Sequence, residues 1–328
     1  MIRVGLVSLA LWSAVACGRS QGVPDQELGG LVVEVKPPDK PIDLDRAARD
    51  PAELGRALMR PYRTVVASLP PHTATLAAKT TVEETGKVTD DLGETTTIQL
   101  GDGGTYHAEY TNTADYGREV TFVGGKLYLR PRYQRWHGRA PETADEPAQL
   151  RDGFFAPIGA TWDLLAPAAE LTDLGPAQVA GRTGRKIAIK LSPTPAKPAV
   201  ETVTQRKWRE LRVVEELAGE VVLDVEKGVP LSVKLVGAVG FARDGRRFRM
   251  RVSITAAIGP IGATPISAPP DGEVVATPER LREVDDRDYL LQGIAPPIRK
   301  NSDGTAVSPT PAPAPSPPKA TPPAKGAP

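Results

Sequence analysis

The feature that most limits the fold is an alternation of apolar and polar residues that runs from about His72 to Ala257. Successive side chains of a strand point to opposite faces, so each alternating segment predicts a strand with one apolar face. Apolar or inward-facing positions of the clearest segments are Thr96, Ile98, Leu100, Tyr106, Ala108 and Tyr110. Short turns rich in glycine and aspartate separate the segments, as at Gly124-Gly125 and Arg243-Asp244-Gly245. Such turns are typical of antiparallel hairpins.

A few segments interrupt this alternation and predict helices. Asp50-Pro51 is a favourable helix start, because aspartate caps helix N-termini and proline suits the first helical position. Apolar residues then recur at spacings of three and four as far as Leu69, and Pro61 is expected to kink or end the helix. A short second helix is predicted over Trp162 to Leu171. Thr277-Pro278 predicts the start of a last helix of about ten to fifteen residues.

These patterns together predict a mainly β fold of the α+β class. We expect a curved antiparallel sheet, or incomplete β-barrel, of about eight to eleven strands that is covered by two or three helices. Strands that follow one another through short turns, each with one apolar face, fit an open or incompletely closed barrel.

The N-terminus has the layout of a secretory signal. Arg3 precedes a short apolar stretch, Val4 to Ala16, which ends in small residues and is shorter than the roughly 20 apolar residues that cross a bilayer. The only cysteine of the chain, Cys17, follows at once. Ala14-Val15-Ala16-Cys17 resembles the lipobox of bacterial lipoproteins, although that motif most often has leucine at the place of Ala14. The resemblance implies that Cys17 is acylated and becomes the mature N-terminus; the alternative is an ordinary signal peptide.

The composition changes along the chain and predicts its organisation. Residues 1–16 form the lipoprotein signal peptide, and residues 17–41, rich in glycine, proline and charge, form the lipidated cysteine and a flexible tether. A half-barrel domain is expected over residues 42–299. Residues 300–328 are a Pro/Ala-rich stretch that contains too few apolar residues to fold, so a disordered tail is predicted.

Composition and motifs argue against several function classes. With 41 basic and 40 acidic residues the formal net charge is +1, which gives no basic surface for nucleic acid. The three histidines, His72, His107 and His137, lie far apart, without the spacing of a metal site, and we expect such strand histidines to be exposed. We find no catalytic motif. The sequence therefore predicts no enzyme, no metal and no cofactor.

Two hairpin segments resemble the lipoprotein-carrier half-barrel (LolA/LolB-like) superfamily. They are residues 124–130, GGKLYLR, and residues 223–231, LDVEKGVPL. With the order of helix, strand meander and covering helix, the resemblance spans about Asp43 to Ile258. It implies a half-barrel that binds an acyl chain, a lipid or a lipidated protein non-covalently. The loop Thr113 to Gly117 is polar, unlike the leucine-bearing loop that the superfamily's receptor inserts into membrane, and this departure argues against that specific role.

In such a half-barrel the apolar face of the sheet and the first helix would line the ligand site. The candidate lining residues are Leu58, Tyr62, Tyr106, Tyr110, Phe122, Leu127, Leu129 and Trp162. A closed dry core requires the same residue types, so the sequence leaves a ligand cavity and a filled interior as alternatives.

A row of arginines alternates with apolar residues near the end of the predicted sheet. Arg247, Arg249 and Arg251 share one strand face, opposite Phe248 and Met250. The row is either an ordinary solvent face or a contact surface for anionic lipid headgroups or a partner.

The sequence as a whole predicts an outer-membrane or periplasm-facing lipoprotein that binds an apolar ligand and is held at the membrane by its N-terminal lipid. Gly18 after the cysteine favours the outer membrane under the enterobacterial sorting rule. The alternative is a structural or accessory cell-envelope lipoprotein with a filled core and no ligand.

Overall fold

The computed structural model of the chain describes residues 40–262 and 264–275. The predicted signal, Cys17, nearly all of the tether, the predicted helix after Thr277-Pro278 and the tail lie outside the described residues.

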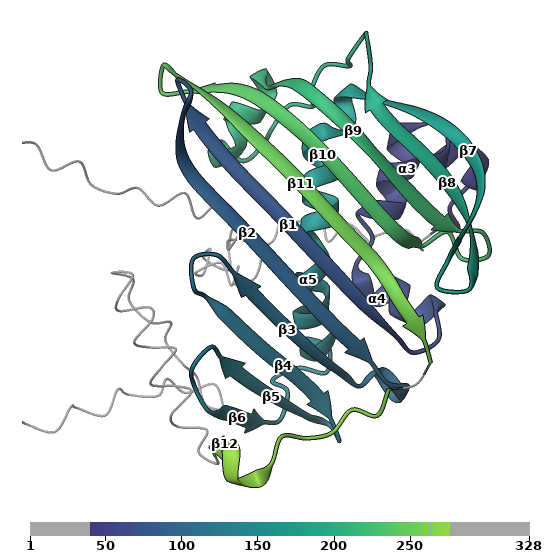
Figure 1. The fold of residues 1–328 in the computed structure, drawn as a ribbon, viewed down its shortest axis with the longest axis vertical. Coiled ribbons are helices and arrows are strands. Elements are labelled where there is room, and N and C mark those ends of the chain that lie inside the picture. The colour runs from purple at the N-terminus through teal and green to yellow at the C-terminus, as the bar shows by residue number, and fades with distance from the viewer. Residues whose placement is uncertain (1–39, 263, 276–328) are drawn as a thin grey trace, which may run out of the picture. The chain divides into compact units, whose positions relative to one another are not determined.

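The described residues form one open sheet of 12 strands in the order β12-β6-β5-β4-β3-β2-β1-β11-β10-β9-β8-β7 (Figure 1). Neighbouring strands are antiparallel, except that β12 pairs in parallel with β6. The strands are β1 (His72–Glu84), β2 (Lys87–Leu100), β3 (Tyr106–Asn112), β4 (Gly117–Val123), β5 (Lys126–Pro131), β6 (Trp136–Arg139), β7 (Ala169–Val179), β8 (Arg182–Leu191), β9 (Val213–Asp224), β10 (Pro230–Arg243), β11 (Arg246–Ile261) and β12 (Val274–Val275). The predicted fold class, a curved and incompletely closed sheet with helices against it, is confirmed.

The helices lie against one face of this sheet (Figure 1). They are α2 (Leu44–Ala47), α3 (Pro51–Leu58), α4 (Tyr62–Ser68) and α5 (Glu146–Leu165), with short 3-10 turns η2 (Asp102–Gly104), η3 (Ala166–Ala168), η4 (Thr204–Leu211) and η5 (Asp271–Glu273). The predicted cap is present: the Asp50 side chain accepts a hydrogen bond from the Ala52 N–H at 2.9 Å. As predicted, Pro61 ends one helix before the next begins, and it separates α3 from α4.

The predicted bounds of the second helix, Trp162 to Leu171, are wrong. Helix α5 begins at Glu146 and ends at Leu165, and from Ala169 the chain is strand β7. The buried residues of α5 recur at spacings of three and four and include Phe154, Phe155, Ile158, Trp162 and Leu165. Gly153, Pro157 and Gly159 interrupt this pattern with residues that disfavour helix interiors, so the first part of the helix is hard to recognise in the sequence.

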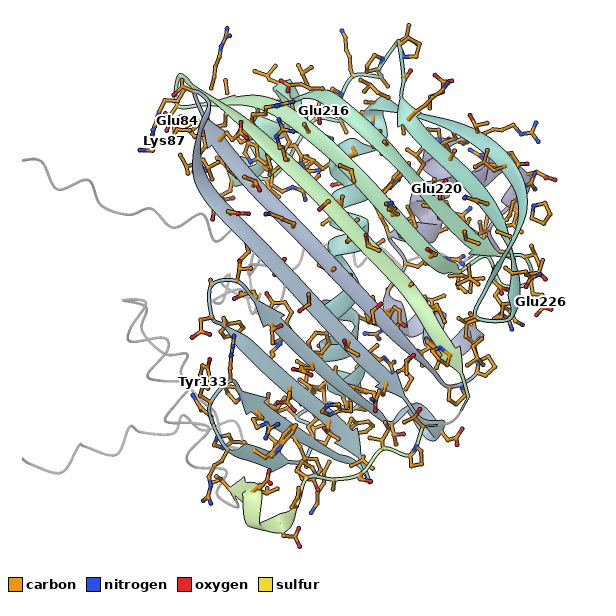
Figure 2. All side chains as sticks on the ribbon, viewed as in Figure 1. Glu84, Lys87, Tyr133, Glu216, Glu220 and Glu226 are labelled. Carbon is orange, nitrogen blue, oxygen red and sulfur yellow. The ribbon has the colours of Figure 1, made fainter. Side chains whose placement is uncertain are left out.

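The core lies between the helices and the inner face of the sheet. Its fully buried side chains come from strands on both sides of β1, among them Ile98, Leu127, Ile187 and Leu235. The opposite face carries charged side chains, and Figure 2 shows Glu216 and Glu220 of β9 there. This one-sided burial is the physical origin of the alternation in the sequence.

Candidate functional site

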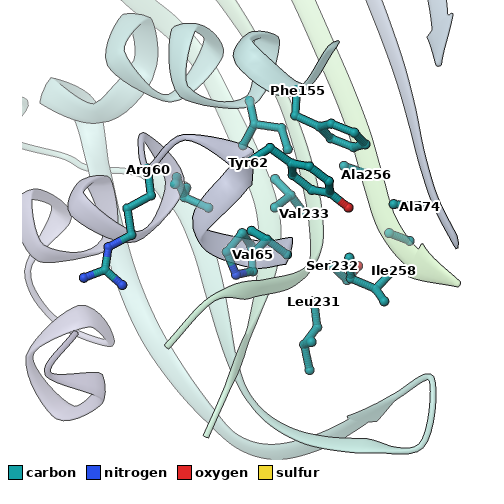
Figure 3. Close-up of a pocket in the computed structure, with 14 residues that line it drawn as sticks. Arg60, Tyr62, Val65, Ala74, Phe155, Leu231, Ser232, Val233, Ala256 and Ile258 are labelled. Atoms are coloured by element: carbon teal, nitrogen blue, oxygen red, sulfur yellow. The ribbon is translucent and has the colours of Figure 1, made fainter. Parts of the chain in front are cut away.

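A cavity lies between the helix layer and the sheet, in the part of the core that α3, α4 and α5 cover (Figure 3). Its volume is about 30 Å³, which is about the space of one water molecule. The lining side chains come from three helices and from strands β1, β10 and β11, and include Leu58, Tyr62, Val65, Ala74, Phe155, Ile158, Val233, Ala256 and Ile258. They are mostly apolar, so the site is suited to hydrocarbon rather than to polar solutes.

A second hollow of about 160 Å³ lies at the other end of α4. Val66 of α4 lines it, together with Leu69, which follows the helix, Pro70-Pro71, His72 and the turn Gly101–Gly104. Because Tyr62 and Val65 line the first cavity, the short helix α4 covers both hollows.

Tyr62 and His72 connect the walls of the two hollows. The Tyr62 hydroxyl lies 3.0 Å from His72 Nε2, and His72 Nδ1 lies 2.8 Å from the Pro70 carbonyl oxygen. Burial lowers the pKa of His72, which favours the neutral ring. With Nδ1–H donating to the carbonyl, Nε2 is left to accept the Tyr62 O–H. Burial also raises the pKa of Tyr62, so the phenol keeps the proton that it donates.

Helix α4 is held in place by an aromatic stack and by an ion pair. The Tyr62 ring stacks on Phe155 of α5 with ring centroids 3.7 Å apart. Arg63 donates two hydrogen bonds to Asp152, from its backbone N–H to Oδ1 at 2.6 Å and from its side-chain Nε to Oδ2 at 2.5 Å. The Arg63 Nη1 also pairs with Asp145. Hydrogen bonds to Asp152 and Asp145 raise the pKa of Arg63. These contacts fix a helix that has no side-chain cap of its own.

The eight predicted lining residues do not share one cavity. Leu58 and Tyr62 line the cavity described above. Five of the eight are buried in the common core, Leu58, Tyr62, Tyr106, Leu127 and Trp162, and the remaining three pack partly buried against it, Tyr110, Phe122 and Leu129. A ligand site that includes the other six of these residues stays a prediction.

The arginine row on β11 is partly neutralised by glutamates of neighbouring strands. Arg249 pairs with Glu215 and Glu216 at 2.7 Å each. Arg251 lies 3.5 Å from Glu83 and 3.7 Å from Glu216. Within the described ranges no ion pair is found for the exposed Arg247. Contact of this row with anionic headgroups stays a prediction.

Sequence reasoning missed Phe155 as a lining residue and misjudged two of the histidines. His72 and His137 were expected to be exposed, but they are 1% and 7% exposed. His72 is buried because it is the first residue of β1 and lies beneath α4, a contact that strand alternation does not reveal. Arg151 of α5 is also buried, at 7% exposed, and no sequence signal distinguished it from a surface arginine.

No helix in the described part of the chain is long and apolar enough to span a membrane. In the same residues no group of three or more histidine, cysteine, aspartate or glutamate side chains is placed to bind a metal ion. The predicted lipidation site, Cys17, lies outside the described ranges.

No protein-family model matches the chain, and no curated protein matches it significantly. Among solved structures, it is similar to the Mycobacterium tuberculosis lipoprotein LppX, with 11% identity over 64% of this chain and 98% of that chain and a TM-score of 0.27. A LolA superfamily protein from Nitrosomonas europaea matches with 6% identity over 62% of this chain and 90% of that chain, at a TM-score of 0.19. The Pseudomonas aeruginosa MucA/MucB complex matches with 18% identity, 60% and 59% coverage and a TM-score of 0.17.

Identities and TM-scores of this size carry no argument about function. The architecture itself, an open sheet with helices against one face, is the half-barrel architecture that the sequence predicts.

Proposed function

We propose that this chain is an exported cell-envelope lipoprotein whose half-barrel binds an apolar ligand non-covalently beneath α4. The observation that supports the proposal is the position of α4, which covers both an apolar cavity and a second, larger hollow. Tyr62 belongs to the wall of the first and His72 to the wall of the second, and the two side chains are hydrogen-bonded to each other. Movement of either side chain would therefore change the walls of both hollows.

Binding would begin with the Tyr62 ring leaving Phe155 as α4 moves outward. This movement breaks one buried hydrogen bond, worth about 1 kcal/mol net, and an aromatic stack worth about 0.5–1.5 kcal/mol beyond its buried area. An alkyl chain that takes the vacated place gains about 0.8 kcal/mol for each buried methylene. Ten buried methylenes therefore contribute about 8 kcal/mol. This gain has to offset the hydrogen bond, the stack, the lost burial of Tyr62 and the Arg63–Asp152 contact.

The membrane location in this proposal rests on the N-terminal sequence. An acylated Cys17 would hold the half-barrel at a membrane surface, with residues 18–41 as the tether, and Gly18 favours the outer membrane. A diacylated and N-acylated cysteine carries enough methylenes for a durable anchor. Replacement of Cys17 by alanine should abolish labelling of the protein by a palmitate analogue in cells, and retained label would exclude this anchor.

One observation favours the alternative, a structural or accessory envelope lipoprotein without a ligand. The cavity beneath Tyr62 has a volume of about 30 Å³, which is too small for an alkyl chain unless α4 moves. A half-barrel with a permanently filled interior would serve as a rigid body on a lipid tether.

Native mass spectrometry of the chain from Gly18 to Pro328, purified from a lipid-rich host, separates the two functions. The binding proposal expects a stoichiometric lipid adduct that can be extracted and identified. Val65→Leu, which adds one methylene to the cavity wall, should weaken the adduct, whereas Val88→Leu, at a strand position that is 52% exposed, should keep it. A protein that remains free of adducts after incubation with lipids would favour the structural alternative.

A further inference from the structure

Helix α5 carries a buried arginine that has no counter-ion among the described residues. Arg151 is 7% exposed. Its Nε atom is buried and has no hydrogen-bond acceptor. The contact that the structure gives its guanidinium is with the Tyr106 ring, whose centroid lies 5.7 Å from Arg151 Cζ. Buried charges are normally paired and hydrogen-bonded, so this one requires an explanation.

The polar groups near Arg151 are already engaged with other partners. The carboxylate of the adjacent Asp152 is held by Arg63, through the hydrogen bonds described above. The Tyr106 hydroxyl donates to the Pro147 carbonyl oxygen at 2.9 Å, and the Tyr62 hydroxyl donates to His72. Burial lowers the pKa of Arg151, yet a guanidinium remains charged at neutral pH. The charge of Asp152 acts on Arg151 and raises its pKa, but among the described residues no carboxylate forms an ion pair with it, and its buried Nε has no acceptor.

The position of Arg151 relates it to the proposed ligand site. Arg151 and Phe155 are four residues apart on α5 and so lie one above the other on the same helix face. Phe155 lines the cavity, and its stacking partner Tyr62 closes it. The Arg151 charge also acts on Tyr62 and His72, the pair that connects the walls of the two hollows. Arg151 itself lines neither hollow, so an anion held beneath α4 would reach it only after Tyr62 has moved.

We propose that Arg151 binds the acidic headgroup of a single-chain amphiphile, a carboxylate or a phosphate, whose alkyl chain lies beneath α4. The inference rests on the proposed function and adds the ligand class to it. The planar guanidinium presents two parallel N–H donors to such a group, and charge-assisted hydrogen bonds of this kind are about twice as strong as neutral ones. A neutral amphiphile of equal chain length would leave the cation unpaired.

The test compares ligands that have the same twelve-carbon chain and differ in headgroup. This chain is about as long as the alkyl chain of the proposed function. Laurate and dodecyl phosphate are titrated below their micelle concentrations by calorimetry against the chain from Gly18 to Pro328, with 1-dodecanol as the neutral ligand. We expect the anionic ligands to bind about 10- to 100-fold more tightly than dodecanol, the range that one charged hydrogen-bond partner provides.

Variants then assign the preference to one side chain. Arg151→Met should reduce laurate affinity to that of dodecanol without changing dodecanol binding, and Arg151→Lys should retain part of the preference. Arg118→Met is the matched control, because Arg118 also contacts an aromatic ring of α5, with Cζ 4.9 Å from the Phe154 centroid, but is only half-buried. It should leave both affinities unchanged.

The Tm of Arg151→Met without ligand distinguishes a binding role from a structural role, because the two roles predict changes of opposite sign. Removal of an unpaired buried charge should raise the Tm of Arg151→Met, whereas a structural role would lower it.

Equal affinity of the wild-type protein for laurate and dodecanol would overturn the headgroup proposal but not the apolar site. Equal losses of laurate affinity in Arg151→Met and Arg118→Met would do the same. Stabilisation by inorganic phosphate equal to that by laurate would instead assign a free-anion site. Failure of every amphiphile, dodecanol included, would overturn the proposed function itself.

Discussion

Tyr62 and Phe155 stack with their ring planes 10° from parallel, although one belongs to a seven-residue helix and the other to α5. This pair both closes the cavity and attaches α4 to the body of the protein. Its strength therefore determines the stability of the closed state and the cost of opening it.

Tyr62→Ala removes a buried aromatic side chain and its hydrogen bond to His72. We expect the free energy of unfolding to fall by about 3 kcal/mol or more, measured by urea denaturation. Tyr133→Ala is the control, since Tyr133 is 80% exposed, and should change the stability by less than about 0.5 kcal/mol. A loss for Tyr62→Ala no larger than that of the control would show that the stack does not hold α4.

Asp152→Asn weakens the ion pair between Arg63 and α5. Because the pair is partly exposed and Asp145 remains as a partner, the loss should be about 1 kcal/mol, which is an about fivefold larger equilibrium constant for the opening of α4. Hydrogen–deuterium exchange of residues 62–68 should rise by this factor while exchange in the sheet is unchanged. Glu119→Gln, which weakens the Arg130–Glu119 pair on neighbouring strands, should have no effect on α4. Equal exchange in both variants would contradict the assigned role of Asp152.

Two helical glycines offer a matched pair of alanine substitutions. A Cβ on Gly55 of α3 would lie 2.8 Å from Trp162 Nε1, so Gly55→Ala should separate α3 from α5 and destabilise the protein by about 1–3 kcal/mol. A Cβ on Gly153 of α5 would meet no atom within 4 Å. Gly153→Ala should therefore raise the stability by about 0.5–1 kcal/mol, because alanine restricts the unfolded chain and favours helix. Opposite signs in thermal unfolding would confirm the close α3–α5 contact, and equal signs would refute it.

His72 should make the stability depend on pH. Burial lowers the pKa of His72 in the folded protein, whereas in the unfolded chain it is about 6.5. The unfolded state therefore binds the proton more readily, so this contribution is fully present above about pH 6.5 and is lost as the pH falls below it. The urea midpoint should drop between pH 7.5 and 5.5. His72→Phe should flatten that change. An unaltered slope in His72→Phe would mean that His72 is protonated alike in both states.

Local features of the fold were predictable because they depend on neighbours in sequence. The turn at Asp244-Gly245 has φ values of 51° and 74°, the left-handed conformations that an Asp-Gly pair supplies in tight hairpins. The cap at Asp50 and the helix end at Pro61 likewise follow from local chemistry. Alternation identified the inward faces of the strands, as at Ile98 and Leu100, which are 0% and 1% exposed.

The site was predicted less well because it depends on contacts between distant segments. The sequence identified Leu58 and Tyr62, but Phe155 meets them only because α5 crosses behind the sheet. The pairing of Arg249 with Glu215 and Glu216 depends on strand register, which the alternation leaves open. Arg151 has the sequence context of a surface arginine, and its burial follows from the face of α5 on which it lies.

The strand order has a consequence for how the chain reaches this structure. Strands β1 to β6 form one meander and β7 to β11 another, and the two are joined where β1 pairs with β11, as between Thr80 and Val252. During synthesis from the N-terminus, β1 therefore remains an unpaired sheet edge of 13 residues until β11 has been made. Closing so long a loop is slow, and an exposed edge of this length recruits other chains. The interval before the second meander docks is thus the period in which this protein is most exposed to aggregation.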